Sequence, residues 1–259
     1  MRRRLCAILF LAVITAACGG GSPSSPSSQQ PFTYLRSFSV SAVQRILVSR
    51  RDSRLVGKDC SFGDSLTVTR AYRRPDAPLS PADQTIFGWM HGYETGDANG
   101  FTLAGGAAIT ARGGGEWYDA WIDDALADAR VQDTQFIDWL FNSVPDIGIV
   151  QQRVDQTIAM GAVPILWTVP PRVAPNAPDY DEVYTKPHNA RLIAFCDARG
   201  LPCIDLYAAM TENPNWRTEL VSADGVHLTL AGYDLRTGLL VEMIGQLKHL
   251  AVDTLSTLR

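Results

Sequence analysis

Cysteine and histidine are scarce in this chain, which has five cysteines and four histidines in 259 residues. Their spacing matches no metal-binding pattern, so the sequence predicts no metal site. Basic residues are outnumbered by acidic ones, and the formal net charge of −4 gives no reason to expect a nucleic acid or an anionic membrane surface as a partner. The apolar run at 5–14 is too short to cross a bilayer. There is no internal repeat, and a hydrophobic content of 46% fits one globular domain with appendages.

The first 18 residues have the pattern of an export signal. Arginines at 2–4 precede the apolar run, and small residues at 15–17 follow it. We therefore expect a signal peptide at 1–17. Cys18, directly after the small residues, resembles the lipobox cysteine of bacterial lipoproteins. That resemblance implies cleavage before Cys18, a lipid on Cys18, and an exported protein anchored to a membrane of the bacterial cell envelope. Plain secretion with an incidental cysteine is the alternative.

The remainder divides into three parts. Residues 18–30 are rich in Gly, Ser and Pro and cannot bury apolar surface, so we expect a flexible tether. Residues 31–54 show no clean periodicity and are interpreted as an N-terminal extension packed on the domain, which occupies 55–259. Loss of 1–17 would remove three of the 23 basic residues and none of the 27 acidic ones, which leaves a net charge of −7.

Apolar stretches alternate with segments of helical spacing along the domain. The alternation predicts a parallel sheet flanked by helices, that is, a three-layer α/β sandwich with a central five-stranded parallel sheet. In such a sheet, ligands bind beyond the carboxyl ends of the strands. The expected strands are 55–62, 101–104, 134–141, 162–169 and 202–207, and the expected helices are 116–130, 146–160, 184–199 and 229–250.

Ser65 is the candidate nucleophile. It follows the first expected strand in Gly63-Asp64-Ser65-Leu66, where the glycine permits a sharp turn into a helix. At a helix N-terminus, unpaired backbone N–H groups favour developing negative charge. An ordinary turn with a capping serine would have the same sequence.

Asp224 and His227 are its candidate partners. They lie three residues apart before the last expected helix, close enough to meet through a turn. The histidine can act as a general base, and the aspartate can fix its tautomer and offset the imidazolium charge. A turn with a surface histidine is the alternative for this segment alone.

Together, Gly-Asp-Ser-Leu at 63–66 and Asp-Gly-Val-His-Leu-Thr at 224–229 resemble the first and last sequence blocks of the SGNH (GDSL) hydrolase family. The order Ser65, Asp224, His227 is also similar to the family's. The resemblance implies a flavodoxin-like sandwich in which these three residues are catalytic, with the backbone N–H of Ser65 in the oxyanion hole.

The resemblance also implies two further oxyanion donors. The family's glycine after the second strand corresponds to Gly106, chosen over Gly105 in Ala-Gly-Gly-Ala at 104–107. The asparagine of its Gly-x-Asn-Asp block corresponds to Asn142. Here the chain departs from the family, because Leu140 and Ser143 replace the flanking Gly and Asp.

By this resemblance the protein is a serine esterase that hydrolyses carboxylic esters through an acyl-enzyme. The substrates would be O-acetyl groups on a glycan or short-chain acyl esters, with no metal or organic cofactor, and the protein would be a monomer. Two alternatives stay open. The chain could be a non-catalytic glycan-binding lipoprotein on the same fold, or an acyltransferase that uses the same three residues.

Cysteine pairing is the remaining question. With Cys6 removed and Cys18 lipidated, three cysteines are left. Cys196 and Cys203 are close in sequence, at the end of a helix and the start of a strand, so they form the most plausible disulfide. Two free buried thiols are the alternative.

Overall fold

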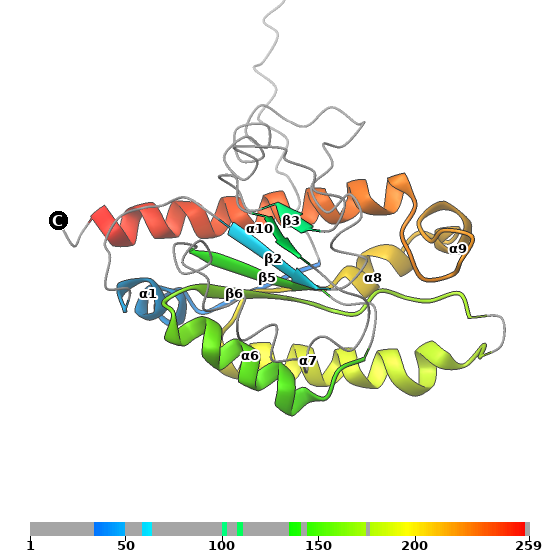
Figure 1. The fold of residues 1–259 in the computed structure, drawn as a ribbon, viewed down its shortest axis with the longest axis horizontal. Coiled ribbons are helices and arrows are strands. Elements are labelled where there is room, and N and C mark those ends of the chain that lie inside the picture. The colour runs from blue at the N-terminus through cyan, green and yellow to red at the C-terminus, as the bar shows by residue number, and fades with distance from the viewer. Residues whose placement is uncertain are drawn as a thin grey trace, which may run out of the picture. The chain divides into compact units, whose positions relative to one another are not determined.

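A mixed sheet of five strands forms the centre of the fold (Figure 1). The structure is a computed structural model that describes residues 34–49, 59–63, 100–102, 108–110, 135–140, 144–174 and 177–256. The strand order is β1-β7-β6-β5-β2. These strands are β1 (Leu35–Arg36), β2 (Asp59–Gly63), β5 (Phe136–Leu140), β6 (Val163–Trp167) and β7 (Cys203–Ile204).

The prediction of a five-stranded parallel sheet is wrong in two respects. Four strands, β2, β5, β6 and β7, are parallel, but β1 pairs antiparallel with β7 at the edge. The strand expected at 101–104 is not in this sheet, since β3 (Gly100–Thr102) pairs with β4 (Ala108–Thr110) in a separate two-stranded sheet. A strand of two residues such as β1 carries no alternation of side chains that a sequence could reveal. An antiparallel edge strand on a parallel sheet is a common arrangement.

Helices cover both faces of the sheet (Figure 1). The long helix α10 (Leu230–Ser256) packs on one face beside α1 (Val40–Val48), and α6 (Ile147–Ala159) and α7 (Lys186–Arg199) pack together on the other. Every residue of β5 and β6 is buried, as expected for central strands with helices on both sides. The helices expected at 146–160, 184–199 and 229–250 are therefore confirmed in place, whereas 116–130 lies outside the described residues.

The segment interpreted as an N-terminal extension contributes a strand and a helix to the domain. Helix α1 buries Ala42, Val43, Ile46 and Leu47 on one side, the spacing of an amphipathic helix. Its N-cap is Ser39, whose side chain accepts a hydrogen bond from the Ala42 N–H at 3.2 Å. The N–H of Ser39 in turn donates to the carbonyl of Gly200 at 3.0 Å, which joins the start of α1 to the end of α7.

A buried ion pair attaches α10 to the sheet. The guanidinium of Arg236 lies 3.4 Å from the Asp138 carboxylate of β5, and both side chains are at most 1% exposed. The indole N–H of Trp167, on β6, donates to the same carboxylate oxygen at 3.1 Å. A buried charge requires such partners. The contacts fix α10, and with it the loop that precedes it, relative to two central strands.

Cys196 and Cys203 are buried free thiols in the structure, in place of the predicted disulfide. A hydrogen bond with Cys196, together with burial, raises the pKa of the Cys203 thiol. Both residues belong to the apolar core between α7 and β7, where a neutral thiol is the favoured form. Cys18 and the tether lie outside the described residues. None of the helices in the described part of the chain has both the length and the apolar character needed to cross a membrane.

Candidate active site

The loop before α10 is a hydrogen-bonded hairpin. Val221 and Leu228 form an antiparallel bridge, and the Ser222 N–H donates to the His227 carbonyl at 2.8 Å. A further hydrogen bond, from the Thr229 N–H to the Leu220 carbonyl at 3.0 Å, closes the open end of the hairpin. The Thr229 hydroxyl also donates to the carbonyl of Glu219, the last residue of the short helix α9 (Trp216–Glu219). The hairpin is therefore fixed at one end to α9 and at the other to α10.

Asp224 and His227 face each other across the tip of this hairpin. The imidazole Nδ1 lies 2.5 Å from the Asp224 Oδ2. The side chains are partly exposed, at 52% for Asp224 and 36% for His227. When Nδ1 carries the proton that is shared with the carboxylate, the basic lone pair of the ring lies on Nε2. This is the arrangement needed for a general base whose tautomer is fixed by a carboxylate.

The second oxygen of Asp224 holds the carboxylate in position. Its Oδ1 accepts hydrogen bonds from the Ser222 hydroxyl at 2.7 Å and from the backbone N–H groups of Val226 and His227 at 2.9 Å each. Burial alone would raise the pKa of Asp224, but these hydrogen bonds and the one with the imidazole hold it well below its usual range. The group is therefore a carboxylate at any pH at which the protein is expected to work.

Gly225 forms the turn between the two residues. Its φ is +75°, a left-handed conformation that favours glycine. The turn packs against the segment after β6, where the Val173 N–H donates to the Gly225 carbonyl at 2.9 Å. A Cβ at position 225 would lie only 1.9 Å from the Val173 carbonyl oxygen. The hairpin and the segment after β6 are thus in direct backbone contact.

Ser65, Gly106 and Asn142 lie outside the described residues, so their roles stay predictions. The strands that precede Ser65 and Asn142 are described. β2 and β5 are parallel neighbours, and Gly63 pairs with Leu140 at their carboxyl ends. Each candidate residue comes two positions after one member of this pair. The last described residues before Ser65 and Asn142 are therefore paired partners on adjacent strands.

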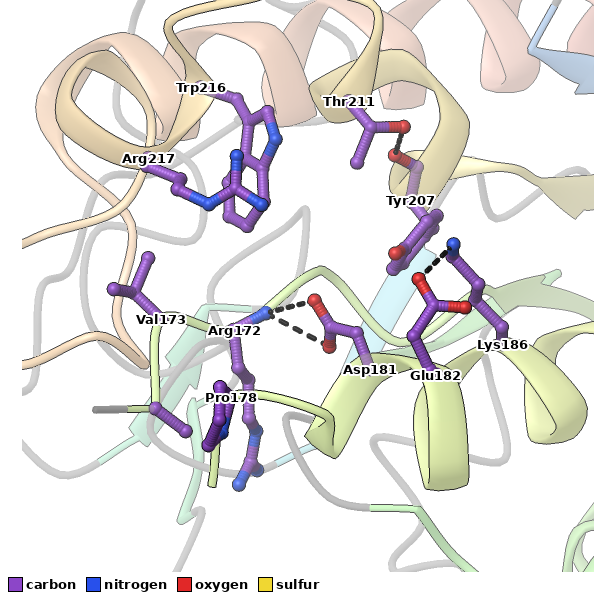
Figure 2. A pocket seen from close by; sticks show the side chains of 11 residues that line it. Arg172, Val173, Pro178, Asp181, Glu182, Lys186, Tyr207, Thr211, Trp216 and Arg217 are labelled. Carbon is purple, nitrogen blue, oxygen red and sulfur yellow. Dashed lines mark hydrogen bonds and ion pairs between the residues drawn. The ribbon is translucent and has the colours of Figure 1, made fainter. Parts of the chain in front are cut away.

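A pocket of about 520 Å³ lies beside the hairpin. Figure 2 shows its four walls. They come from the segment after β6, the π-helical turn η2 (Asp181–Thr185) with the start of α7, the short helix α8 (Leu206–Thr211), and α9. The lining residues are Arg172, Val173, Ala174, Pro178, Asp181, Glu182, Lys186, Tyr207, Thr211, Trp216 and Arg217.

Sequence reasoning missed this pocket. The only available signal was position, because its residues follow the carboxyl ends of the strands expected at 162–169 and 202–207, the edge where ligands bind in parallel sheets. Five of its eleven lining residues are charged. Asp181 accepts from a backbone N–H, and Glu182 pairs with Lys186.

Asp181 and Tyr207 illustrate the electrostatics of the pocket. Both Asp181 oxygens lie 3.2 Å from the backbone N–H of Arg172, and burial raises the pKa of the Asp181 carboxyl. Burial, with the nearby carboxylates of Asp181 and Glu182, raises the pKa of Tyr207 to about 12. The phenol therefore stays a neutral hydroxyl.

Among the residues that the structure describes, no three His, Cys, Asp or Glu side chains lie close enough together to hold a metal ion.

Comparison with known proteins finds one family model that matches part of the chain and several solved structures with a similar fold. A family model described as the GDSL-like Lipase/Acylhydrolase family matches residues 119–235, a span that includes Asp224 and His227 but not Ser65. A comparison with curated proteins found no match.

Several solved structures are similar to this chain, and two of them illustrate the likeness. One is the lipase/acylhydrolase from Enterococcus faecalis, 21% identical over 73% of this chain and 95% of that protein, with a TM-score of 0.50. Another is a GDSL-like lipase from Bacteroides thetaiotaomicron, 17% identical over 80% of this chain and 99% of that protein, also with a TM-score of 0.50. At these identities the likeness shows a shared fold. The match of the family model to residues 119–235 supports an enzyme that hydrolyses ester bonds.

Proposed function

We propose that the protein is a serine esterase in which Ser65 is the nucleophile, His227 the general base and Asp224 the group that orients the base. The observation that carries the proposal is the 2.5 Å contact between His227 Nδ1 and the Asp224 carboxylate. The carboxylate is itself held by three further hydrogen bonds. The paired carboxyl ends of β2 and β5 support the same arrangement, because Ser65 and Asn142 each follow one member of the Gly63–Leu140 pair by two residues.

The proposed reaction proceeds through an acyl-enzyme. The Ser65 hydroxyl attacks the ester carbonyl while its proton moves to His227 Nε2, and the resulting oxyanion accepts hydrogen bonds from the N–H groups of Ser65 and Gly106 and the amide of Asn142. The imidazolium then protonates the departing alcohol. Water, deprotonated by His227, then attacks the acyl-enzyme, and the imidazolium returns this proton to the Ser65 oxygen as the acid is released.

The proposal also covers the substrates and the location of the protein. The substrates are O-acetyl groups on a glycan or short-chain acyl esters. The protein is a monomeric lipoprotein of the bacterial cell envelope, attached through a lipid on Cys18. A Cys18→Ala variant expressed with its signal sequence should move from the membrane fraction to the soluble fraction. Equal membrane association of both proteins would contradict the lipid anchor.

The central test is covalent labelling of the purified protein with a fluorophosphonate. Wild-type protein should gain one adduct, located on Ser65 by peptide mass, and should hydrolyse p-nitrophenyl acetate. Ser65→Ala should lose both properties while keeping its circular dichroism spectrum. A folded wild-type protein that takes no label would contradict the esterase and favour the glycan-binding alternative. Product analysis with an alcohol acceptor present would show an acyltransferase by the appearance of the transferred ester.

A further inference from the structure

We propose that the pocket beside the hairpin binds the alcohol part of the ester, and that this part is an uncharged sugar ring. The inference rests on the proposed esterase activity and assigns its substrate class to particular residues. Three observations carry it: the attachment of two pocket walls to the Asp224–His227 hairpin, the chemistry of the lining, and the balance of charge within it.

Two of the walls are continuous with the hairpin or in contact with it. The segment that carries Arg172 and Val173 meets the hairpin through the hydrogen bond from the Val173 N–H to the Gly225 carbonyl. Helix α9, which carries Trp216 and Arg217, leads directly into the hairpin and accepts the Thr229 hydroxyl at its last residue. A ligand in this pocket therefore contacts the same backbone segments that position the general base.

The lining of the pocket has both hydrogen-bond donors and hydrogen-bond acceptors. The guanidinium of Arg217 lies 4.5 Å above the centre of the Trp216 ring, and this stacking holds a planar donor at the pocket wall. Figure 2 shows Tyr207 and Glu182 on the other side of the pocket from Trp216 and Arg217. A hydroxyl group both donates and accepts, so neighbouring sugar hydroxyls can bond to carboxylates on one side and to a guanidinium on the other.

The charges exclude a long acyl chain from this pocket. Arg172, Asp181, Glu182, Lys186 and Arg217 all contribute to its surface. An alkyl chain would strip water from these groups without replacing their hydrogen bonds, which is unfavourable. The two signs are also nearly balanced, and Lys186 is already paired with Glu182. The pocket therefore favours a neutral polyhydroxylated ring over a multiply charged ligand, and its volume is in the range of pockets that hold small organic molecules.

A matched pair of esters tests the assignment. One is a methyl glucoside that carries a single acetyl group; the other is cyclohexyl acetate, which has a ring of the same size without hydroxyls. Wild-type enzyme should show a higher kcat/KM for the acetylated glucoside. Arg217→Ala, a change at an exposed side chain, should lower this preference by about tenfold or more, because it removes a charged donor. Arg45→Ala, at an exposed position of α1, should keep the wild-type preference.

The outcomes separate this inference from the esterase proposal. Hydrolysis of both esters with equal kcat/KM, unaffected by Arg217→Ala, would overturn the sugar assignment and leave the esterase intact. Failure to hydrolyse either ester would contradict the esterase instead. In that case binding of unacetylated methyl glucoside to the full-length protein, measured by calorimetry and lost in Arg217→Ala, would still support the pocket, and an absence of binding would overturn it.

Discussion

The carbonyl oxygen of Val173 occupies the position that a side chain at Gly225 would need. The ideal Cβ of residue 225 would lie 1.9 Å from this oxygen and 2.9 Å from its carbon, while the Val173 N–H donates to the Gly225 carbonyl. The hairpin that bears Asp224 and His227 is thus packed backbone to backbone against the segment after β6. This close contact restrains the position of the turn between Asp224 and His227.

A methyl group at Gly225 should therefore disturb the site more than the fold. We expect Gly225→Ala to lower the stability by about 1–3 kcal/mol, because an L-residue is strained at φ +75° and the hairpin must move away from Val173. The shift should reduce kcat by more than about tenfold, since small misplacements of catalytic groups are costly. Urea denaturation and ester hydrolysis measure the two effects.

Gly238 provides the matched control. It lies within α10, and nothing is within 4 Å of a Cβ built there. Gly238→Ala should leave the activity unchanged and stabilise the protein by about 0.5–1 kcal/mol, because alanine favours a helix. Equal losses of activity in both variants would show that the contact with Val173 is unimportant.

Removal of the Asp224 charge should affect chemistry far more than substrate binding. Asp224→Asn keeps the shape but cannot fix the tautomer or offset the imidazolium, and we expect kcat to fall by on the order of 10³–10⁴ with little change in KM. Steady-state hydrolysis of p-nitrophenyl acetate measures this. Asp155→Asn, which breaks an exposed ion pair with Arg199, should have no such effect. A fall of less than tenfold for Asp224→Asn would contradict the role of the carboxylate.

His188 should make the stability of the protein depend on pH. The ring is 1% exposed, and its Nδ1 has no hydrogen-bond partner among the described residues. Burial, and to a smaller extent Arg191, lowers the pKa of His188 to about 4. The unfolded chain, where a histidine has a pKa of about 6.5, binds more protons between these values. His188 therefore does not lower the free energy of unfolding above about pH 6.5. Below that pH the free energy of unfolding falls toward pH 4, by up to about 3 kcal/mol.

The measurement is urea denaturation across this pH range. His188→Leu places an apolar side chain among the apolar neighbours of the ring, which include Val150 and Leu192. The variant should lose less stability than the wild type between pH 7 and pH 4, because other titrating groups are the same in both proteins. Parallel curves for the two proteins would show that His188 is not the group responsible.

Removal of one partner of the buried ion pair should lower the free energy of unfolding substantially. Arg236→Met leaves the Asp138 carboxylate buried without its cation, and we expect a loss of about 3–5 kcal/mol. The double variant Asp138→Asn, Arg236→Met should recover much of this loss, because the asparagine is neutral and still accepts from Trp167. Thermal denaturation of the three proteins tests the expectation. A double variant no more stable than Arg236→Met would show that shape, and not charge, accounts for the loss.

Long periodic elements of the fold could be predicted from the sequence, and short ones could not. The apolar run of β6 and the apolar stripe of α6 are strong signals. Helix α1 was missed although Val43, Ile46 and Leu47 have helical spacing, because Val40 and Val48 are 52% and 47% exposed and obscure the apolar stripe. Helix α9, with four residues, is too short to show a period at all.

The candidate site also has one part that could be predicted from the sequence and one part that could not. Asp224 and His227 are three residues apart, so a single turn is enough to bring them together, and their contact could be expected. The pocket depends instead on residues brought together by tertiary structure. The hydrogen bonds from the Arg172 N–H to Asp181 join positions nine residues apart through an irregular segment, and Trp216 reaches them from a different part of the chain. No spacing rule connects such positions.

The short strand β1 has a practical consequence for handling this protein. Leu35 and Arg36 take up the outer hydrogen-bonding groups of β7, a strand whose residues are otherwise fully buried. If the chain were shortened from its N-terminus past Arg36, those groups would be exposed and could recruit a strand from another molecule. A version shortened at its N-terminus should therefore begin before Tyr34, or self-association is to be expected.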